Sequence, residues 1–154
     1  MAVKTLSRQR DKDELLRRLQ TVHPDTAPRW GRMSAHQMVC HLSDALLMAT
    51  GERAVSAATG VRARALIKWI ALYAPLPWPA GIPTSAETDQ ERGGTRPVDF
   101  QSDLAQVRAL VERVARRAGA GSWPVHPVFG RMSEADWLRW AYVHTDHHLR
   151  QFKA

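Results

Sequence analysis

Apolar residues recur along this chain at the three- and four-residue intervals of α-helices, and no stretch shows the sustained alternation typical of a strand. Leu15, Leu16 and Leu19, for example, share one side of a segment that stops at His23-Pro24. The pattern therefore predicts an all-α protein. Helices are expected over Asp11–Val22, from a cap at Ser34 to Thr50, over Val61–Ala74, over Phe100–Ala118, and from a cap at Ser133 onward.

Two of the expected helices begin with the same short pattern. The run Trp30–Ser34 precedes one of them and Phe129–Ser133 precedes the other. Each run ends in a serine, which is a good N-cap. Gln37, three residues after Ser34, completes a capping box, and Asp136 lies three residues after Ser133. Gly51 is expected to end the first of these two helices.

The length of 154 residues suits one domain, taken here as residues 1–154. The single cysteine, Cys40, excludes an internal disulfide framework. The most apolar stretch, Ala65–Ile82, contains Lys68 and three prolines, which would break a membrane-spanning helix. With no secretory signal visible, we expect a cytoplasmic protein that does not enter the membrane. The Pro/Gly-rich stretch Pro75–Pro97 is too long for an idle connection, so it is expected to cross the molecule or line a pocket.

The chain is basic, with 22 Lys and Arg against 15 Asp and Glu, giving a formal net charge of +7. The positive residues are spread over two segments and form no continuous tract, which is typical of solvated helix faces. A nucleic-acid-binding module is one interpretation of this charge. No recognition helix or stacking platform accompanies it, so we do not expect nucleic acid to be the partner.

The histidines carry most of the chemical information. With about 100° per residue, His144 and His148 lie about 40° apart and one turn from each other, in the middle of the apolar arc of the last helix. His147 falls at the edge of that arc. On the second helix, His41 shares the apolar stripe, whereas His36 points roughly the other way. Three histidines are thus expected to project toward the core.

These three inward imidazoles have two interpretations. A histidine on an apolar face is usually a core residue whose nitrogens are paired, because an unpaired buried ring is costly. A divalent ion is the other solution, since it binds one nitrogen of each ring, as metal sites between facing helices do. Three neutral ligands would leave positions open for water or substrate, which is typical of a catalytic site. Periodicity alone leaves both interpretations open, because it does not show that the helices meet.

Short motifs resemble those of a known family. The run His144–Gln151 has the pattern H-x-x-H-H-x-x-Q, which resembles the last helix of the DinB/YfiT-like metal-binding four-helix superfamily. Met33–Asp44 is similar to the second helix of that superfamily, where a histidine is followed by Leu-x-Asp. Pro77–Thr84 and His126–Gly130 are similar to an uncharacterised branch of it. The similarity spans about Trp30–Phe152.

The resemblance implies a DinB-like up-down-down-up four-helix bundle with a long crossover between bundle helices 2 and 3. Here that crossover is Gly51–Asp99, which contains the extra helix Val61–Ala74. The resemblance also implies a divalent ion, zinc or nickel, held by the residues that match the family ligands, namely His41, His144 and His148.

Other residues are expected around these ligands. Gln151 matches the family glutamine, and its spacing from His144 would let it bond a ligand ring or a metal-bound water. His147 and His36 are implied as neighbours of the ligands. Asp44, one turn from His41, either orients that imidazole or is an ordinary exposed helix charge.

Relatives of the resembled superfamily include transferases that use a low-molecular-weight thiol, a thiol-dependent isomerase and proteins labelled as hydrolases. The resemblance therefore implies a metal-dependent small-thiol S-transferase or a hydrolase acting on a small molecule, in which the ion activates a thiol or a water. The alternative is a non-catalytic metal-binding or interaction bundle. No catalytic side chain is assigned, because Cys40 faces away from His41 and no motif surrounds it.

A homodimer is also expected, because exposed apolar bundle surface would favour association. Trp78 lies in the proline-rich crossover, where it could cover the metal pocket or pack against a second subunit. We favour packing against a second subunit.

Overall fold

The computed structural model describes residues 3–154, and every regular element in this range is helical. The described residues contain no strand beyond a single bridge between His126 and Gly130. The prediction of an all-α protein is therefore confirmed. The elements are α1 (Gln9–Leu19), α2 (Ala35–Thr50), α3 (Arg64–Tyr73), the short 3-10 helix η1 (Ala86–Thr88), α4 (Phe100–Arg116) and α5 (Glu134–Gln151).

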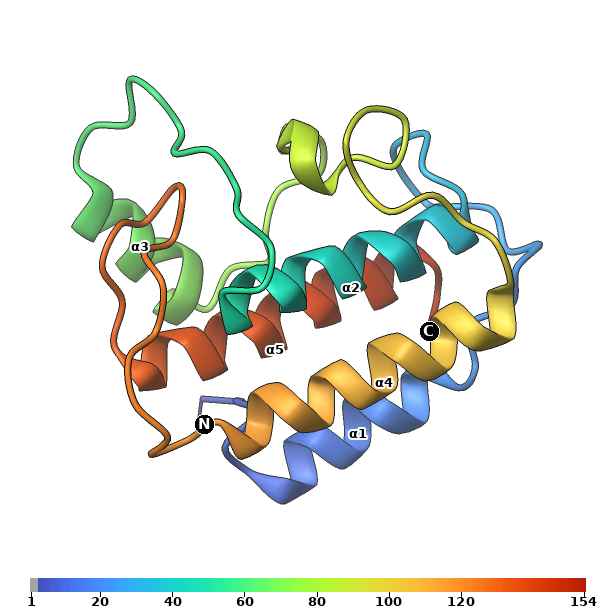
Figure 1. The fold of residues 1–154 in the computed structure, drawn as a ribbon, viewed down its shortest axis with the longest axis horizontal. Coiled ribbons are helices and arrows are strands. Elements are labelled where there is room, and N and C mark those ends of the chain that lie inside the picture. The colour runs from blue at the N-terminus through green and yellow to red at the C-terminus, as the bar shows by residue number, and fades with distance from the viewer. Residues whose placement is uncertain (1–2) are drawn as a thin grey trace.

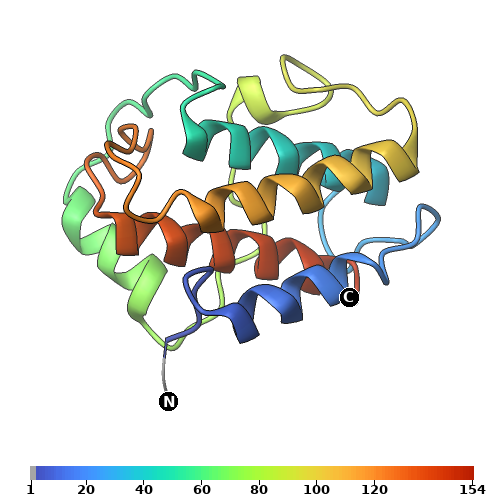
Figure 2. The same ribbon diagram turned by 60° about the horizontal axis from the view of Figure 1, so that its bottom comes forward.

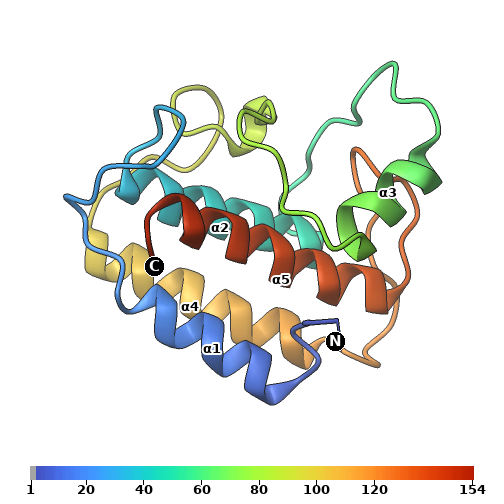
Figure 3. The ribbon, with the colours of Figure 1, turned by 180° about the vertical axis from the view of Figure 1, so that it is seen from behind.

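Helices α1, α2, α4 and α5 lie side by side, and α3 lies outside this group, next to the start of α5 (Figure 1). The colour gradient shows α1 and α5 running in one direction and α2 and α4 in the other (Figures 1 and 2). Seen from behind, α5 lies between α2 and α1 (Figure 3). The apolar faces of these four helices meet in one core, whose fully buried side chains include Leu15, Leu42, Val111, Trp137 and Leu149.

The predicted N-caps of α2 and α5 are confirmed. Ser34 accepts a hydrogen bond from the backbone N–H of Gln37, and the side chain of Gln37 accepts one from Ser34 in return. Ser133 and Asp136 form the equivalent box at α5. Gly51 ends α2 with a φ of 82°, a left-handed conformation that favours glycine. These caps fix where α2 and α5 begin.

The predicted end of the first helix is three residues too late. The helix stops at Leu19, and a turn follows in which the Thr21 hydroxyl donates to the carbonyl of Arg18. Local side-chain bonding of this kind competes with helix continuation. The helical spacing of apolar residues therefore extends beyond the end of the helix. The helix ends before it reaches His23-Pro24, so the proline does not terminate it.

Helix α3 belongs to the long crossover and packs on the start of α5. The ammonium of Lys68 and the hydroxyl of Tyr73 both donate to the Asp136 carboxylate, at 2.8 and 2.6 Å. Leu72 is the one side chain of α3 that is fully buried. The crossover thus holds α3 against the bundle by one face and leaves its other faces open. None of the helices in residues 3–154 is both long enough and apolar enough to span a membrane.

Candidate metal centre

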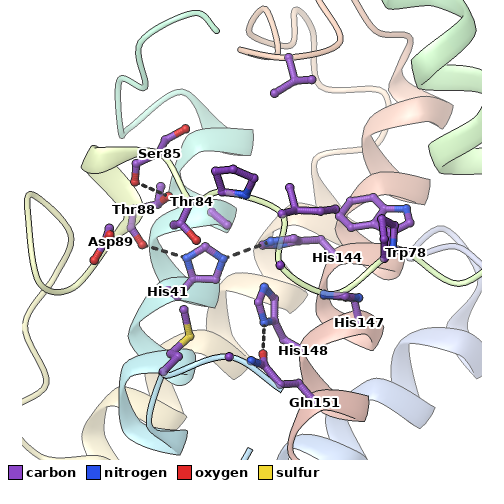
Figure 4. Close-up of a pocket in the computed structure, with 18 of the residues that line it drawn as sticks. His41, Trp78, Thr84, Ser85, Thr88, Asp89, His144, His147, His148 and Gln151 are labelled. Atoms are coloured by element: carbon purple, nitrogen blue, oxygen red, sulfur yellow. Dashed lines mark hydrogen bonds between the residues drawn. The ribbon is translucent and has the colours of Figure 1, made fainter. Parts of the chain in front are cut away.

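The three histidines predicted to face the core come together between α2 and α5 (Figure 4). His41 lies near the middle of α2, and His144 and His148 follow each other by one turn on α5. The Nε2 atoms of His41 and His144 are 3.2 Å apart. One ring nitrogen of each histidine lies within 4.8 Å of the other two, so the three side chains can reach a common ion.

Two fixed acceptors determine which nitrogens of His41 and His148 carry protons. Nδ1 of His41 lies 2.8 Å from the carbonyl oxygen of Thr88, and Nδ1 of His148 lies 2.8 Å from Oε1 of Gln151. A carbonyl oxygen only accepts, so both Nδ1 atoms must donate. The Gln151 amide is itself oriented, because its nitrogen donates to the carbonyl of Trp30 at 2.8 Å. Both rings are therefore left with a lone pair on Nε2.

The surroundings keep these imidazoles neutral. Burial lowers the pKa of His41, and the hydrogen bond to Thr88 offsets part of that effect. Burial also lowers the pKa values of His144 and His148 well below the usual value, with repulsion from the neighbouring histidines adding to it. A metal ligand must be a neutral imidazole, so the group is ready to bind a cation near pH 7.

The donor set fits a divalent metal ion. The Nε2 lone pairs of His41 and His148 can bind a cation because the Nδ1 atoms of these rings already donate elsewhere, and Nε2 of His144 lies 3.2 Å from that of His41, close enough to bind the same ion. Imidazole nitrogens are the usual ligands of zinc and suit nickel as well. In such sites the second ring nitrogen characteristically bonds a carbonyl or amide, as it does at His41 and His148.

The histidine group forms the floor of a pocket of about 730 Å³. His41 is buried, and His144 and His148 are half-buried because they face this space. Figure 4 shows Thr84, Ser85 and Asp89 on the side of the pocket nearest His41, and Trp78 on the opposite side beside His144. A substrate could therefore enter the pocket and reach the three nitrogens.

Aromatic rings enclose the α5 side of the site. The Trp140 ring stacks on His144 with an interplanar angle of 9° and a centroid distance of 4.9 Å. Trp78 lies 5.9 Å from both His144 and His147, and its indole N–H donates to the carbonyl of Ala71. Trp78 thus covers the pocket within this chain, which is one of the two roles predicted for it, and packing on a second subunit stays a prediction. His147 is a neighbour of the group, with its ring 5.2 Å from that of His148.

A glycine lets the Trp30 loop approach Gln151. Gly31 has a φ of 78°, and a Cβ atom built there would lie 3.2 Å from the Gln151 amide nitrogen. The backbone N–H of Arg29 also donates to the carbonyl of Gln151 at 2.8 Å. The loop before α2 therefore positions Gln151, which in turn orients His148.

Asp44 has neither of the two roles that the sequence suggested. It is completely buried and accepts from the N–H and hydroxyl of Thr95, at 2.8 and 2.6 Å, and from Arg53 at 2.8 Å. The His41 ring is instead oriented by the carbonyl of Thr88. Asp44 binds the crossover to α2, and its negative charge raises the pKa of His41 at a distance.

A second cluster lies at the contact between α2 and α4, and its members are not among the residues that line the pocket. His36 is 2.7 Å from an oxygen of Asp103, and the Cys40 thiol lies 3.6 Å from the same oxygen. Burial raises the pKa of Cys40 to about 12, with help from the charge of Asp103. The thiol stays protonated at neutral pH, in keeping with the expectation that Cys40 is not a nucleophile.

Sequence reasoning missed two contributors to the site. Thr88 acts through its backbone carbonyl, which no side-chain pattern could reveal. His126 lines the pocket and is 5% exposed, and its Nδ1 accepts from the backbone N–H groups of Val128 and Phe129. Burial lowers its pKa to about 3. The resembled run His126–Gly130 was the one signal that marked it.

The sequence model of the DinB superfamily matches residues 6–152, nearly the whole chain. The chain belongs to the DinB superfamily. Members of this superfamily bind metal ions, and the all-helical fold and the histidine cluster of this member are consistent with that property. Neither a curated protein nor a solved structure matches the chain significantly.

Proposed function

We propose that this DinB superfamily protein is a divalent-metal-dependent enzyme whose ion, zinc or nickel, is held by His41, His144 and His148. The observation that carries the proposal is the position of three neutral imidazoles at the floor of a pocket that is open to solvent. Structural zinc sites have four protein ligands, whereas three protein ligands leave a position for water or substrate. The chain directions in the bundle support assigning it the up-down-down-up order of the superfamily.

The reaction we propose is transfer to or from a small thiol, or hydrolysis. When bound, a divalent ion supplies Lewis-acid chemistry, lowering the pKa of a coordinated thiol or water so that it is a nucleophile near neutral pH. The protein's own groups prepare that position. Thr88 and Gln151 hold the rings of His41 and His148 in the required tautomer. Trp78 and Trp140 limit access of water from the α5 side.

The test of the metal site is elemental analysis of protein purified without an affinity tag or a nickel resin. Wild type should carry about one zinc or nickel per chain, and His148→Ala should lose it. The matched control is His147→Ala, which removes the adjacent ring that lies outside the ligand group, and it should keep the ion. Full metal content in His148→Ala would contradict the proposed ligand set.

The test of catalysis separates an enzyme from a metal-binding bundle without activity. The metal-loaded protein is assayed on a panel of small thiols with electrophiles and on a panel of esters and amides. We expect turnover on one of the panels in wild type and in His147→Ala, and none in His148→Ala. Stoichiometric metal without turnover on either panel would favour the non-catalytic bundle.

A further inference from the structure

The pocket above the histidines has two chemically different sides. Beyond the histidines, one side is polar and includes Thr84, Ser85 and Asp89 (Figure 4). The other side is apolar and is built from α3 and the segment that follows it. Its large side chains are exposed by 39 to 68%, although aliphatic groups of this size usually lie in a core. They are Ile67, Ile70, Leu76 and Ile82.

These four side chains all line the same pocket, so they are not scattered over the surface, and we call them the apolar wall. Single exposed apolar residues need no explanation, but a cluster that borders a cavity marks a binding groove. Some large apolar side chains of the described residues are exposed, and four of them belong to this wall. Leu66 and Trp69 of the same helix are also exposed but do not line the pocket. The wall is therefore a feature of the pocket.

Several hydrogen bonds hold the wall in place. The Asp136 carboxylate accepts hydrogen bonds from Lys68 and Tyr73 of α3. The guanidinium of Arg64 donates to the carbonyl of Pro127 at 2.9 Å. The Trp78 indole bonds the carbonyl of Ala71 at 2.6 Å. These bonds hold α3 at both of its ends, so Ile67 and Ile70 cannot move onto the histidines to bury their own apolar surface. An external apolar group can supply that burial.

We propose that the substrate is an amphiphile with an extended apolar group, which lies along the wall of Ile67, Ile70, Leu76 and Ile82. Its polar head reaches the floor formed by the histidines, so this inference rests on the proposed function and names its substrate class. The polar head faces Thr84, Ser85 and Asp89, which can form hydrogen bonds, and the apolar group covers the apolar wall, whose side chains cannot. A small hydrophilic substrate would leave the wall in water.

Two hydroxamates test the proposal, because they share a metal-binding head and differ in the tail. Acetohydroxamate has a methyl tail, and octanohydroxamate has six more methylene groups. Each is titrated against protein that holds the fluorescent probe 1-anilinonaphthalene-8-sulfonate, and displacement of the probe gives its affinity. If half of the added apolar surface is buried on the wall, octanohydroxamate binds about 50-fold more tightly than acetohydroxamate. Equal affinities would overturn the proposal.

Matched double variants locate the tail. Ile67→Asn/Ile70→Asn should lower the ratio of the two affinities by about tenfold, because it replaces two apolar contacts of the wall with polar ones. Leu66→Asn/Trp69→Asn changes the same helix outside the pocket and should leave the ratio unchanged. All four side chains are exposed, so neither variant should unfold the protein. An unchanged ratio in the first variant would refute the assignment of the wall.

Two further results separate this proposal from others. In His148→Ala both affinities should fall while their ratio persists. If neither affinity falls, the proposed metal function is wrong, and a persisting ratio still supports the apolar wall. Sedimentation velocity tests whether a second copy of the chain covers the wall instead. A dimer that Ile67→Asn/Ile70→Asn converts to a monomer would overturn the proposal.

Discussion

Acid should destabilise this protein through His126, and the variant His126→Asn isolates the effect. The ring is 5% exposed and packs between Phe129 and Trp140, with centroid distances of 4.5 and 5.2 Å. Nδ1 accepts two backbone hydrogen bonds, and no partner of Nε2 exists within the described residues. The fold thus accepts the neutral ring and has no acceptor for a second N–H. An asparagine oxygen can replace Nδ1 as the acceptor but does not titrate.

The sign and size follow from the difference in pKa between the two states. Burial lowers the pKa of His126 to about 3, whereas an unfolded histidine titrates near 6.5. Between these values the unfolded state binds more protons, so the free energy of unfolding falls as the pH falls below about 6.5. Lowering the pH from 7.5 to 5.0 should cost wild type about 2 kcal/mol through this residue. The loss would continue until the pH nears 3.

Urea denaturation followed by circular dichroism at both pH values measures this loss. Both proteins are treated with a chelator, so that metal binding contributes nothing. Other titrating groups affect wild type and His126→Asn alike, so the difference between their pH-dependent changes reports His126 alone. Wild type should lose about 2 kcal/mol more than the variant between pH 7.5 and 5.0. An equal loss in the two proteins would refute the argument.

Three further substitutions test contacts around the site. Gln151→Ala should weaken zinc binding by about 10- to 100-fold in a competition titration, because His148 loses its orienting acceptor, whereas Arg150→Ala on the outer face should not. Gly31→Ala should lower the free energy of unfolding by about 1–2 kcal/mol in urea, owing to its φ of 78° and the contact with Gln151, and an unchanged midpoint would argue against the close approach. Asp44→Ala should cost about 3 kcal/mol by the same measurement, because it leaves the partners of a fully buried carboxylate unpaired, and a loss under 1 kcal/mol would count against this anchoring role.

Helix periodicity was enough to find the histidines that meet in the structure. In a straight helix, the direction of each side chain follows from its position, so His41, His144 and His148 could be assigned to inward faces without knowing the fold. The cap residues Ser34 and Ser133 were equally predictable, because the capping box depends on residues three apart. That the two helices face each other came only from the structure.

The residues in the crossover could not be placed in this way. Thr88, Trp78 and the partners of Asp44 lie in a stretch where no repeating pattern fixes the path of the backbone. Their contacts depend on how the chain returns to α2 and α5 after α3, which is a tertiary property. Asp44 illustrates the limit. Its helical position suggested either a contact with His41 or an exposed charge, whereas its carboxylate accepts hydrogen bonds from the crossover residue Thr95.

The hydrogen bonds between the crossover and α2 determine where this chain tolerates insertions. Thr88 bonds His41 at one end of a short segment, and Thr95 bonds Asp44 at the other, with Gln90 also donating to Asp44 at 2.9 Å. Extra residues between positions 88 and 95 would have to release one of these ends. The exposed loop around Gly60 has open space, and its attachments, from the N–H of Ala58 and the guanidinium of Arg64 to the carbonyl of Pro127, do not involve α2. Two glycines inserted after Gly60 should leave zinc affinity unchanged, and the same two after Gly93 should reduce it; equal affinities would show that the segment is slack.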